Sequence, residues 1–410
     1  MQFAFFLLFI VAVLMLGSVT VGPFSLRVYM TVLMLLYLLI TRKPIRERVY
    51  GIRRDYISWF LIALVMLCIS LLFNGGLEEF GFFEKCLSHY LVCIVAYFAI
   101  DRFVKEDLHF DAIVGVLSLI ILFDACVTFL QYQNNPIGWG LGIVFSSVEQ
   151  VEMFSDYLID HDSLVGVSKL PGIFGHPVSN GFFLSVAAAM LLTAIGNNKS
   201  KIISFYYIVT ILVVMVAIFL LQQRAAFYLM IIVIAYHLLR LFVKKPSRFI
   251  IPVAVIIALV MLFMPSSGAD DIEMGKLASS DNSSRTSVWT LAFTVFMNNP
   301  LFGDIVQYNQ HAEYSAHNVL VDSLVDSGIF GFIPLLYLYV KTVIDSLRIM
   351  FKSKSNYARV FSYSVLISMG MGMFHNTSYL TGDVIIFIAL ALMFKAQILT
   401  MKNQQQIIMR

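Results

Sequence analysis

The side chains that could do chemistry are three basic ones in the second half of the chain, Arg224, Arg285 and His317. Each is expected at an end of a helix near a membrane surface. Arginine keeps its charge and can bind a phosphate through two parallel hydrogen bonds, so two arginines can hold a diphosphate leaving group. Histidine can take a proton from an attacking hydroxyl near neutral pH. These residue types indicate a site for a diphosphate-linked lipid, in which His317 is the candidate catalytic base and no metal or cofactor is required.

The segment around His317 predicts a helix that starts at the exposed surface. At 3.6 residues per turn, His317 shares a face with Leu320 and Leu324, whereas Asp322 falls on another face. Gly328 is where this helix could stop or bend. A lone histidine on an amphipathic helix is more often a capping or core residue than a catalytic one, so it is the two arginines that favour catalysis.

Arg285 opens a second amphipathic segment. Cap-prone residues precede it and predict a helix start, and apolar residues follow at helical spacing. These apolar residues are Val288, Trp289, Ala292, Phe293 and Phe296. We expect this helix to lie on the bilayer surface and to end at Asn299 and Pro300. For Arg224, at the end of its span, the competing interpretation is an arginine that snorkels to lipid headgroups.

Three other polar residues are candidates for a supporting role in the site: Asn318, His176 and His375. Asn318 directly follows His317. His176 lies in a turn-rich segment that leads into a span, and His375 lies at the outer end of a later span. The competing interpretation is a turn that leads into the membrane for His176, and a helix cap for His375.

The composition is that of a membrane protein. Of the 410 residues, 60% are hydrophobic and 13% are charged, and the mean hydropathy is +0.85. We therefore predict an all-α polytopic membrane protein that forms a single integral membrane domain, residues 1–410. The four cysteines show no CxxC spacing, so we expect neither a disulfide framework nor a zinc site. About twelve transmembrane helices are expected, at about residues 3–18, 24–41, 56–73, 86–104, 111–131, 179–196, 202–221, 225–242, 249–265, 328–347, 360–379 and 382–400.

The positions of lysine and arginine predict the orientation. They are concentrated in alternate short connectors, which places those connectors and both termini in the cytoplasm. Two long loops, at about 132–178 and 266–327, then face the opposite side, and the second is expected to contain short amphipathic helices. The three candidate residues lie on this outer face.

Three motifs follow one another in this region and resemble a known superfamily. They are Gln223-Arg224-Ala225-Ala226, then Arg285-x-x-x-Trp289 with Asn299-Pro300-x-x-Gly303, then His317-Asn318-x-Leu320-x-x-x-Leu324-x-x-x-Gly328-x-x-Gly331. Their order, over about residues 170–335, resembles the O-antigen polymerases and O-antigen ligases of bacteria. The resemblance implies that Arg224 and Arg285 bind the donor diphosphate and that His317 is the base. The family often has Ser or Thr before the first arginine, where this chain has Gln223.

The resemblance also implies the substrate and the place of action. The donor would be an undecaprenyl-diphosphate-linked glycan, transferred with inversion at the anomeric carbon on the periplasmic face of the bacterial inner membrane. We predict a polymerase that adds the growing glycan to a new lipid-linked repeat unit, with the bilayer and a chain-length regulator as further partners and no nucleic acid. The alternatives are an O-antigen ligase that transfers glycan to lipid A core, and a transporter of lipid-linked sugars.

Overall fold

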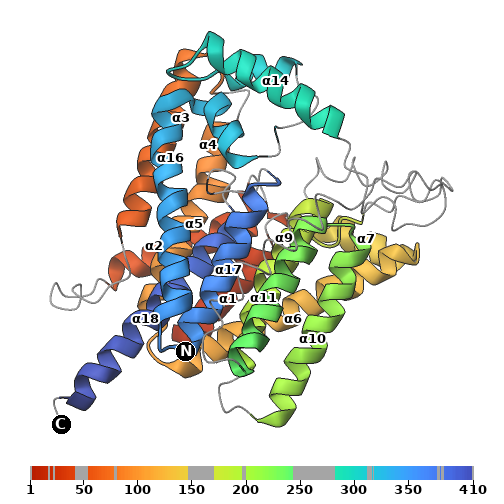
Figure 1. The fold of residues 1–410 in the computed structure, drawn as a ribbon, viewed down its shortest axis with the longest axis vertical. Coiled ribbons are helices and arrows are strands. Elements are labelled where there is room, and N and C mark those ends of the chain that lie inside the picture. Colours follow the sequence, from red (N-terminus) through yellow and green to blue (C-terminus); the bar gives the residue numbers. More distant parts are fainter. Residues whose placement is uncertain are drawn as a thin grey trace. The chain divides into compact units, whose positions relative to one another are not determined.

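The regular structure of the chain is almost entirely helical, as Figure 1 shows. The computed structural model describes residues 2–16, 19–21, 24–41, 54–77, 81–145, 170–195, 200–242, 282–311, 316, 318–375, 379 and 383–408, without the side chains of residues 20, 282–287 and 405–408. The expected span at 249–265 and much of both long loops lie outside the described residues. The chain divides into two compact units: unit 1 is Met1–Val116 with Ser283–Arg410, and unit 2 is Leu117–Asn282.

Unit 1 contains most of the helices. Its elements are α1 (Gln2–Met15), β1 (Thr20–Val21), β2 (Phe24–Ser25), α2 (Leu26–Ile40), α3 (Asp55–Phe73), α4 (Phe82–Lys85), the π-helical turn η2 (Cys86–Tyr90), α5 (Leu91–Phe103), α14 (Asn282–Asn298), α15 (Ile305–His311), α16 (Val319–Lys352), α17 (Asn356–Gly372) and α18 (Val384–Ile408). Strands β1 and β2 form a small antiparallel hairpin that leads into α2. The helix α6 (Asp107–Tyr132) starts in unit 1 and continues into unit 2.

Unit 2 is smaller. Its remaining elements are α7 (Pro136–Phe145), α9 (Pro177–Leu191) with the 3₁₀ turn η3 (Leu192–Ala194), α10 (Lys201–Leu220) and α11 (Arg224–Phe242). The helix α9 packs against both α10 and α11. Because α9 is surrounded in this way, nearly all of its side chains are buried.

The helices confirm an all-α polytopic membrane protein. Among the described residues, eight helices are long and apolar enough to cross a membrane: α3, the run α4–η2–α5, α6, α9 with η3, α10, α11, α16 and α18. Each overlaps an expected span, although α16, at 34 residues, extends well beyond the span expected at 328–347. The first two expected spans are the shorter apolar helices α1 and α2, of 14 and 15 residues. The span expected at 360–379 corresponds to α17, which ends earlier, at Gly372.

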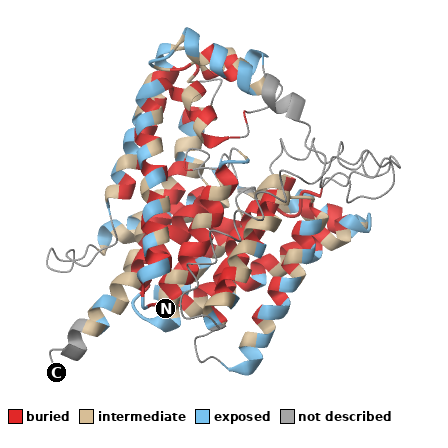
Figure 2. Ribbon diagram, viewed as in Figure 1, coloured by how far each residue is buried: buried red, intermediate tan, exposed pale blue. Residues whose placement is uncertain are grey.

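The interior of unit 1 is formed where α16 packs against α3 and α17, and α18 against α17 and α5. Figure 2 shows the buried residues concentrated on these helices. Two serines of α17 donate within the helix, Ser362 Oγ to Arg359 O at 2.5 Å and Ser368 Oγ to Ser364 O at 2.9 Å, whereas Ser364 Oγ is buried without a partner. The hydroxyls of Ser362 and Ser368 are therefore paired although their helix is buried.

The helix α16 bends where the sequence places a glycine. Its 34 residues run through Gly328, whose φ of 58° and ψ of −162° are not helical. A side chain would clash with the backbone in this conformation, so glycine is the residue that tolerates it. The expected bend is present, and the helix that starts after His317 continues across it as the long helix of unit 1.

Candidate functional site

The bend of α16 is held by the turn that follows α14. Helix bending leaves backbone groups without their usual partners, and this turn supplies new ones. Asp304 N donates to Val325 O at 2.8 Å, Ile329 N to Pro300 O at 2.9 Å, and Phe330 N to Leu301 O at 3.3 Å. The segment after α14 therefore pairs with α16 on both sides of Gly328.

Two glycines allow this close approach. A Cβ on Gly303, whose φ is +66°, would lie 2.2 Å from Val325 O, and a Cβ on Gly328 would lie 2.4 Å from Leu301 O. Such contacts are far shorter than atoms tolerate, so both positions require glycine. The motif Asn299-Pro300-x-x-Gly303 and the later Gly328 thus form one junction, although 25 positions separate the two glycines (328 − 303).

The end of α3 closes the same junction. Ser70 Oγ donates to Asp326 O at 2.8 Å and also lies within hydrogen-bond reach of Phe302 O. Asn74 Nδ2 donates to Gly303 O at 2.8 Å. Hydrogen bonds therefore join the end of α3, the turn after α14 and α16. These bonds set the direction of the first turns of α16.

Asn318 begins α16 as its N-cap. Its Oδ1 accepts from Leu320 N at 3.0 Å and from Val321 N at 3.3 Å, which satisfies two amides that the helix itself cannot pair. Its Nδ2 donates to Met373 O at 3.0 Å, directly after α17. Asn318 therefore both caps α16 and ties its start to the end of α17.

The residue before His317 is held as firmly as the residue after it. Ala316 N donates to Asp322 Oδ1 at 2.8 Å, and Trp289 Nε1 of α14 donates to Ala316 O at 2.7 Å. Ala316 is only 1% exposed and belongs to an apolar cluster of Ala292, Val295, Tyr308, Ala316, Val321 and Val325. His317 itself lies outside the described residues. Its two neighbours are fixed in the core of unit 1 by bonds to α14, α16 and the end of α17.

Asp322 and Trp289 are the residues that sequence reasoning missed. The sequence placed Asp322 on a helical face away from His317, and Trp289 among apolar residues of a surface helix. In the structure a carboxylate oxygen of Asp322 accepts the amide that precedes His317, and its other oxygen, Oδ2, is buried without a hydrogen-bond partner. Asp322 lies six positions after Ala316, a spacing that matches no local capping pattern, so only the tertiary structure shows this bond.

Tyr308 lies near two acidic residues of α16, Asp322 and Asp326. Tyr308 of α15 is 3% exposed. Burial raises the pKa of Tyr308, and the nearby carboxylates of Asp322 and Asp326 raise it further. The phenol therefore stays protonated at physiological pH and can donate a hydrogen bond.

The expected amphipathic helix around Arg285 is α14. Arg285 is its fourth residue, near the N-terminus, and its side chain lies outside the described part of the chain. Along α14, Ala292 and Val295 are buried in the apolar cluster, whereas Phe293 and Met297 are 47% and 72% exposed. The helix is thus apolar on two sides, one packed in unit 1 and one exposed, as expected for a helix at a bilayer surface.

Arg224 begins α11 in unit 2. The connection from α10 is a tight turn in which Gln222 has a φ of 54° and Arg224 N donates to Gln222 O at 3.1 Å. The arginine is partly exposed. Arg224 belongs to unit 2, whereas Arg285 and the neighbours of His317 belong to unit 1. The three-residue site therefore stays a prediction.

The two other histidines lie at helix ends. His176 is the N-cap of α9, where its Nδ1 accepts from Val178 N at 3.2 Å. His375 lies in the turn after α17, with its backbone N donating to Met371 O at 2.9 Å. His176 thus caps α9, in the turn that was expected to lead into a span. The supporting role of both residues in the site stays a prediction.

Asp124, in α6, has a structural role. Its Oδ1 accepts from Ile173 N at 2.9 Å. Gln131 Oε1 accepts from Gly172 N at 2.9 Å, and Gln131 Nε2 donates to Gly172 O at 3.2 Å. Asp124 and Gln131 therefore anchor the segment before His176 to α6 inside unit 2.

One comparison with known proteins bears on this site. Residues 208–336 match the family model described as O-antigen ligase. No curated protein matches the chain. The matched segment contains Arg224, Arg285 and His317 together with the junction at Gly328. The predicted resemblance is confirmed over this segment, and it indicates a multi-pass membrane protein that processes glycans.

Proposed function

Because residues 208–336 match the O-antigen ligase family, we propose that this protein is a glycosyltransferase that polymerises undecaprenyl-diphosphate-linked oligosaccharide repeat units. The proposed site faces the periplasm of a bacterial inner membrane, with both chain termini in the cytoplasm. The observation that carries the proposal is that the matched segment holds all three candidate residues.

In the proposed reaction, a hydroxyl oxygen of the acceptor sugar attacks the anomeric carbon of the donor glycan from the face opposite the diphosphate. The bond from that carbon to the diphosphate oxygen breaks, and its electron pair leaves with undecaprenyl diphosphate. Arg224 and Arg285 bind the diphosphate and stabilise the charge that develops on it. His317 takes the proton of the hydroxyl. One displacement inverts the anomeric centre.

The bonds at Ala316 and Asn318 support the role of His317 as a base. A catalytic group works best when its position is set before the substrate binds, because no ordering is then needed during the reaction. Ala316 is held by Asp322 and Trp289, and Asn318 is held by the start of α16 and by Met373 O. The residue between them is thus attached at both sides to a rigid core.

Purified protein tests the proposal directly. Incubation with lipid-linked repeat units in EDTA should give a ladder of longer lipid-linked glycans and release undecaprenyl diphosphate in equal amount. Arg224→Ala and Arg285→Ala should each lower the rate, and His317→Gln should lower it most. A failure to form longer glycans, while the substrate is shown to bind, would exclude the polymerase.

A second candidate is ligation, the activity that the description of the matched family names. The donor chemistry and the roles of Arg224, Arg285 and His317 would be the same, and only the acceptor would differ. The same assay separates the two when lipid A core is added as a competing acceptor. Transfer to lipid A core without any ladder would identify a ligase. Appearance of lipid-linked sugar on the far side of a sealed vesicle, with no new glycosidic bond, would indicate a transporter.

A further inference from the structure

The first turn of α2 carries polar groups without partners. Ser25 is the N-cap of α2 but its side chain makes no capping bond, and its Oγ is buried without a partner. Nε of Arg27 is likewise buried without a hydrogen-bond partner. Burying a guanidinium nitrogen and a hydroxyl unpaired is costly. The start of a helix also carries partial positive charge, so these groups together favour an anion.

A lysine at the end of α4 and a histidine in the π-helical turn η2 lie near Arg27. The helix α2 packs against η2 and α5. The charges of Arg27 and of Lys85 both act on the imidazole of His89. A π-helical turn in a longer helix is a frequent feature of functional sites, because it redirects side chains that a regular helix would place elsewhere. Two cations, Arg27 and Lys85, thus lie near the imidazole of His89, which can donate a hydrogen bond.

Carboxylates near this cluster do not pair with Arg27 in the described part of the structure. Asp383 attracts the guanidinium electrostatically, and Asp326 attracts Lys85. Asp326 in turn lies close enough to Asp322 for their charges to interact. Because Asp322 holds the amide of Ala316, the cationic cluster and the neighbours of His317 are parts of one polar region of unit 1.

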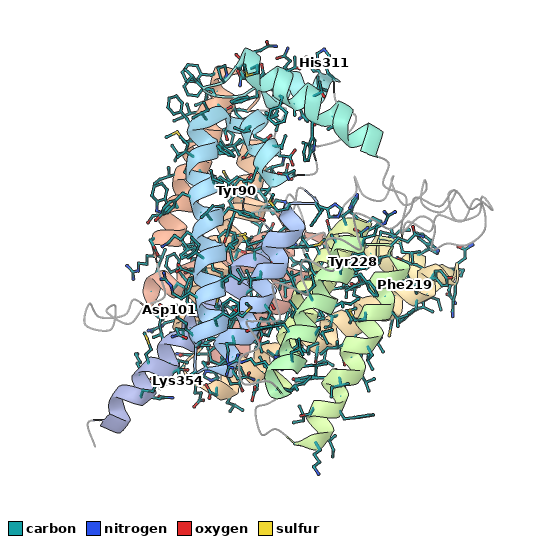
Figure 3. All side chains as sticks on the ribbon, viewed as in Figure 1. Tyr90, Asp101, Phe219, Tyr228, His311 and Lys354 are labelled. Atoms are coloured by element: carbon teal, nitrogen blue, oxygen red, sulfur yellow. The ribbon has the colours of Figure 1, made fainter. Side chains whose placement is uncertain are left out.

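Tyr90 completes this region. It is the last residue of η2, is 2% exposed, and lies inside unit 1 (Figure 3). Its hydroxyl is buried without a hydrogen-bond partner and lies near Asp326. The region between α2, η2 and the start of α16 therefore holds several polar groups that no described protein group satisfies.

We propose that Arg27, with Ser25 and His89, binds a phosphate of the lipid-linked acceptor. This inference rests on the proposed function, in which Arg224 and Arg285 bind the donor diphosphate. A polymerase must hold two lipid diphosphates at once, and the second needs cations of its own. The residues of this second site share unit 1 with the neighbours of His317, where the acceptor hydroxyl must lose its proton.

Equilibrium binding of radiolabelled farnesyl diphosphate to the full-length protein, in detergent free of phospholipid, tests the second site. Wild-type protein should bind about two equivalents of farnesyl diphosphate. Arg27→Gln and Arg285→Gln should each bind about one equivalent with the wild-type affinity. We expect the affinity of the lost site to fall about ten- to a hundred-fold, as for loss of charge-assisted bonds. Farnesol, which lacks phosphate, should not bind.

The controls separate this inference from the proposed function. Arg27→Lys keeps the charge, so it should fold and bind the second equivalent with intermediate affinity, even if Arg27→Gln does not fold. If the wild type binds a single equivalent and only Arg285→Gln loses it, the second site is refuted and the donor site is supported. Loss in Arg27→Gln alone would support the second site and count against the donor arginines.

A phospholipid headgroup is the other source of such a phosphate. If phosphatidylglycerol binds the Arg27-dependent site much more tightly than farnesyl diphosphate does, the site binds bilayer lipid and the acceptor proposal is wrong. Absence of any binding to wild-type protein would also overturn it, whereas the proposed function is judged by glycan elongation.

Discussion

Asp322→Ala tests whether the backbone around residue 317 must be held rigid. The substitution removes the acceptor of the Ala316 amide, which donates to Asp322 Oδ1 at 2.8 Å from a residue that is 1% exposed. Leaving a buried amide unpaired costs about 1–3 kcal/mol. Part of this cost is relieved if residue 316 moves, and a shift of about 1 Å in a catalytic group can lower a rate about a hundred-fold. We therefore expect a modest loss of stability and a loss of kcat of about that size.

Asp322→Asn distinguishes anchoring from a charge effect. Asparagine retains an oxygen at the same place, so it can still accept from Ala316 N, and it removes the repulsion between Asp322 and Asp326. If Asp322 acts as an anchor, the asparagine variant should keep most of the activity and stability. If it acts through its charge on His317, the asparagine variant should lose as much as the alanine variant.

Asp345→Ala is the matched control. Asp345 lies on the same helix and also accepts a buried hydrogen bond, from Tyr56 Oη at 2.7 Å. It is 23 positions further along (345 − 322), about six helical turns away and beyond the bend at Gly328. The assay measures kcat and KM for glycan elongation together with thermal unfolding in detergent. Equal effects of Asp322→Ala and Asp345→Ala on kcat, at equal stability, would refute the anchoring argument.

Four other predictions address the site and the fold. Gly328→Ala should prevent correct folding, because a Cβ there would lie 2.4 Å from Leu301 O, and yield after detergent extraction measures this. His317→Gln should bind the donor but lose about 10²- to 10⁴-fold in transfer rate, and wild-type activity should fall as the pH drops through the pKa of that imidazole, since a base must be neutral. Arg224→Ala and Arg285→Ala should each lower activity about ten- to a hundred-fold, with partial recovery by lysine. Cysteine at Ser283 should react with an impermeant thiol reagent from the periplasmic side.

The controls for these predictions come from the same chain. Gly140→Ala should be tolerated, because a Cβ at Gly140 would meet no atom within 4 Å, and normal yield for Gly328→Ala would show that the junction can adjust. If His317→Gln transfers glycan at the wild-type rate, His317 is a helix-capping residue and not the base. Full activity in both arginine variants would favour snorkelling. Labelling at Ser283 only after lysis would reverse the predicted topology.

The positions of the helices could be predicted from the sequence because each long apolar run needs only its own composition to enter a bilayer. The expected spans at 56–73 and 202–221 correspond to α3 and α10 almost residue for residue. The start of α16 near His317, the bend at Gly328 and the helix that contains Arg285 could also be expected, because capping residues, glycine and apolar spacing act locally.

The junction and the anchoring of residue 316 required the tertiary structure. The hydrogen bond from Ile329 N to Pro300 O joins residues from two elements, and no local pattern specifies that they meet. The same holds for Trp289, whose indole looked like part of an apolar stripe but donates its N–H to Ala316 O. An aromatic side chain has both an apolar surface and a polar atom, and only the packing of α14 against the start of α16 decides where that polar atom finds its partner.

The sequence by itself therefore determined the membrane class, the helix positions and the residue types able to bind phosphate and accept a proton. The tertiary structure decided what surrounds them: Asp322 accepts from Ala316 N, Asn318 bonds to the end of α17, and the Nε of Arg27 at the start of α2 is buried without a hydrogen-bond partner. The physical reason is that burial in a bilayer depends on runs of neighbouring residues, whereas the satisfaction of a buried polar group depends on which distant residue the fold brings within hydrogen-bond distance.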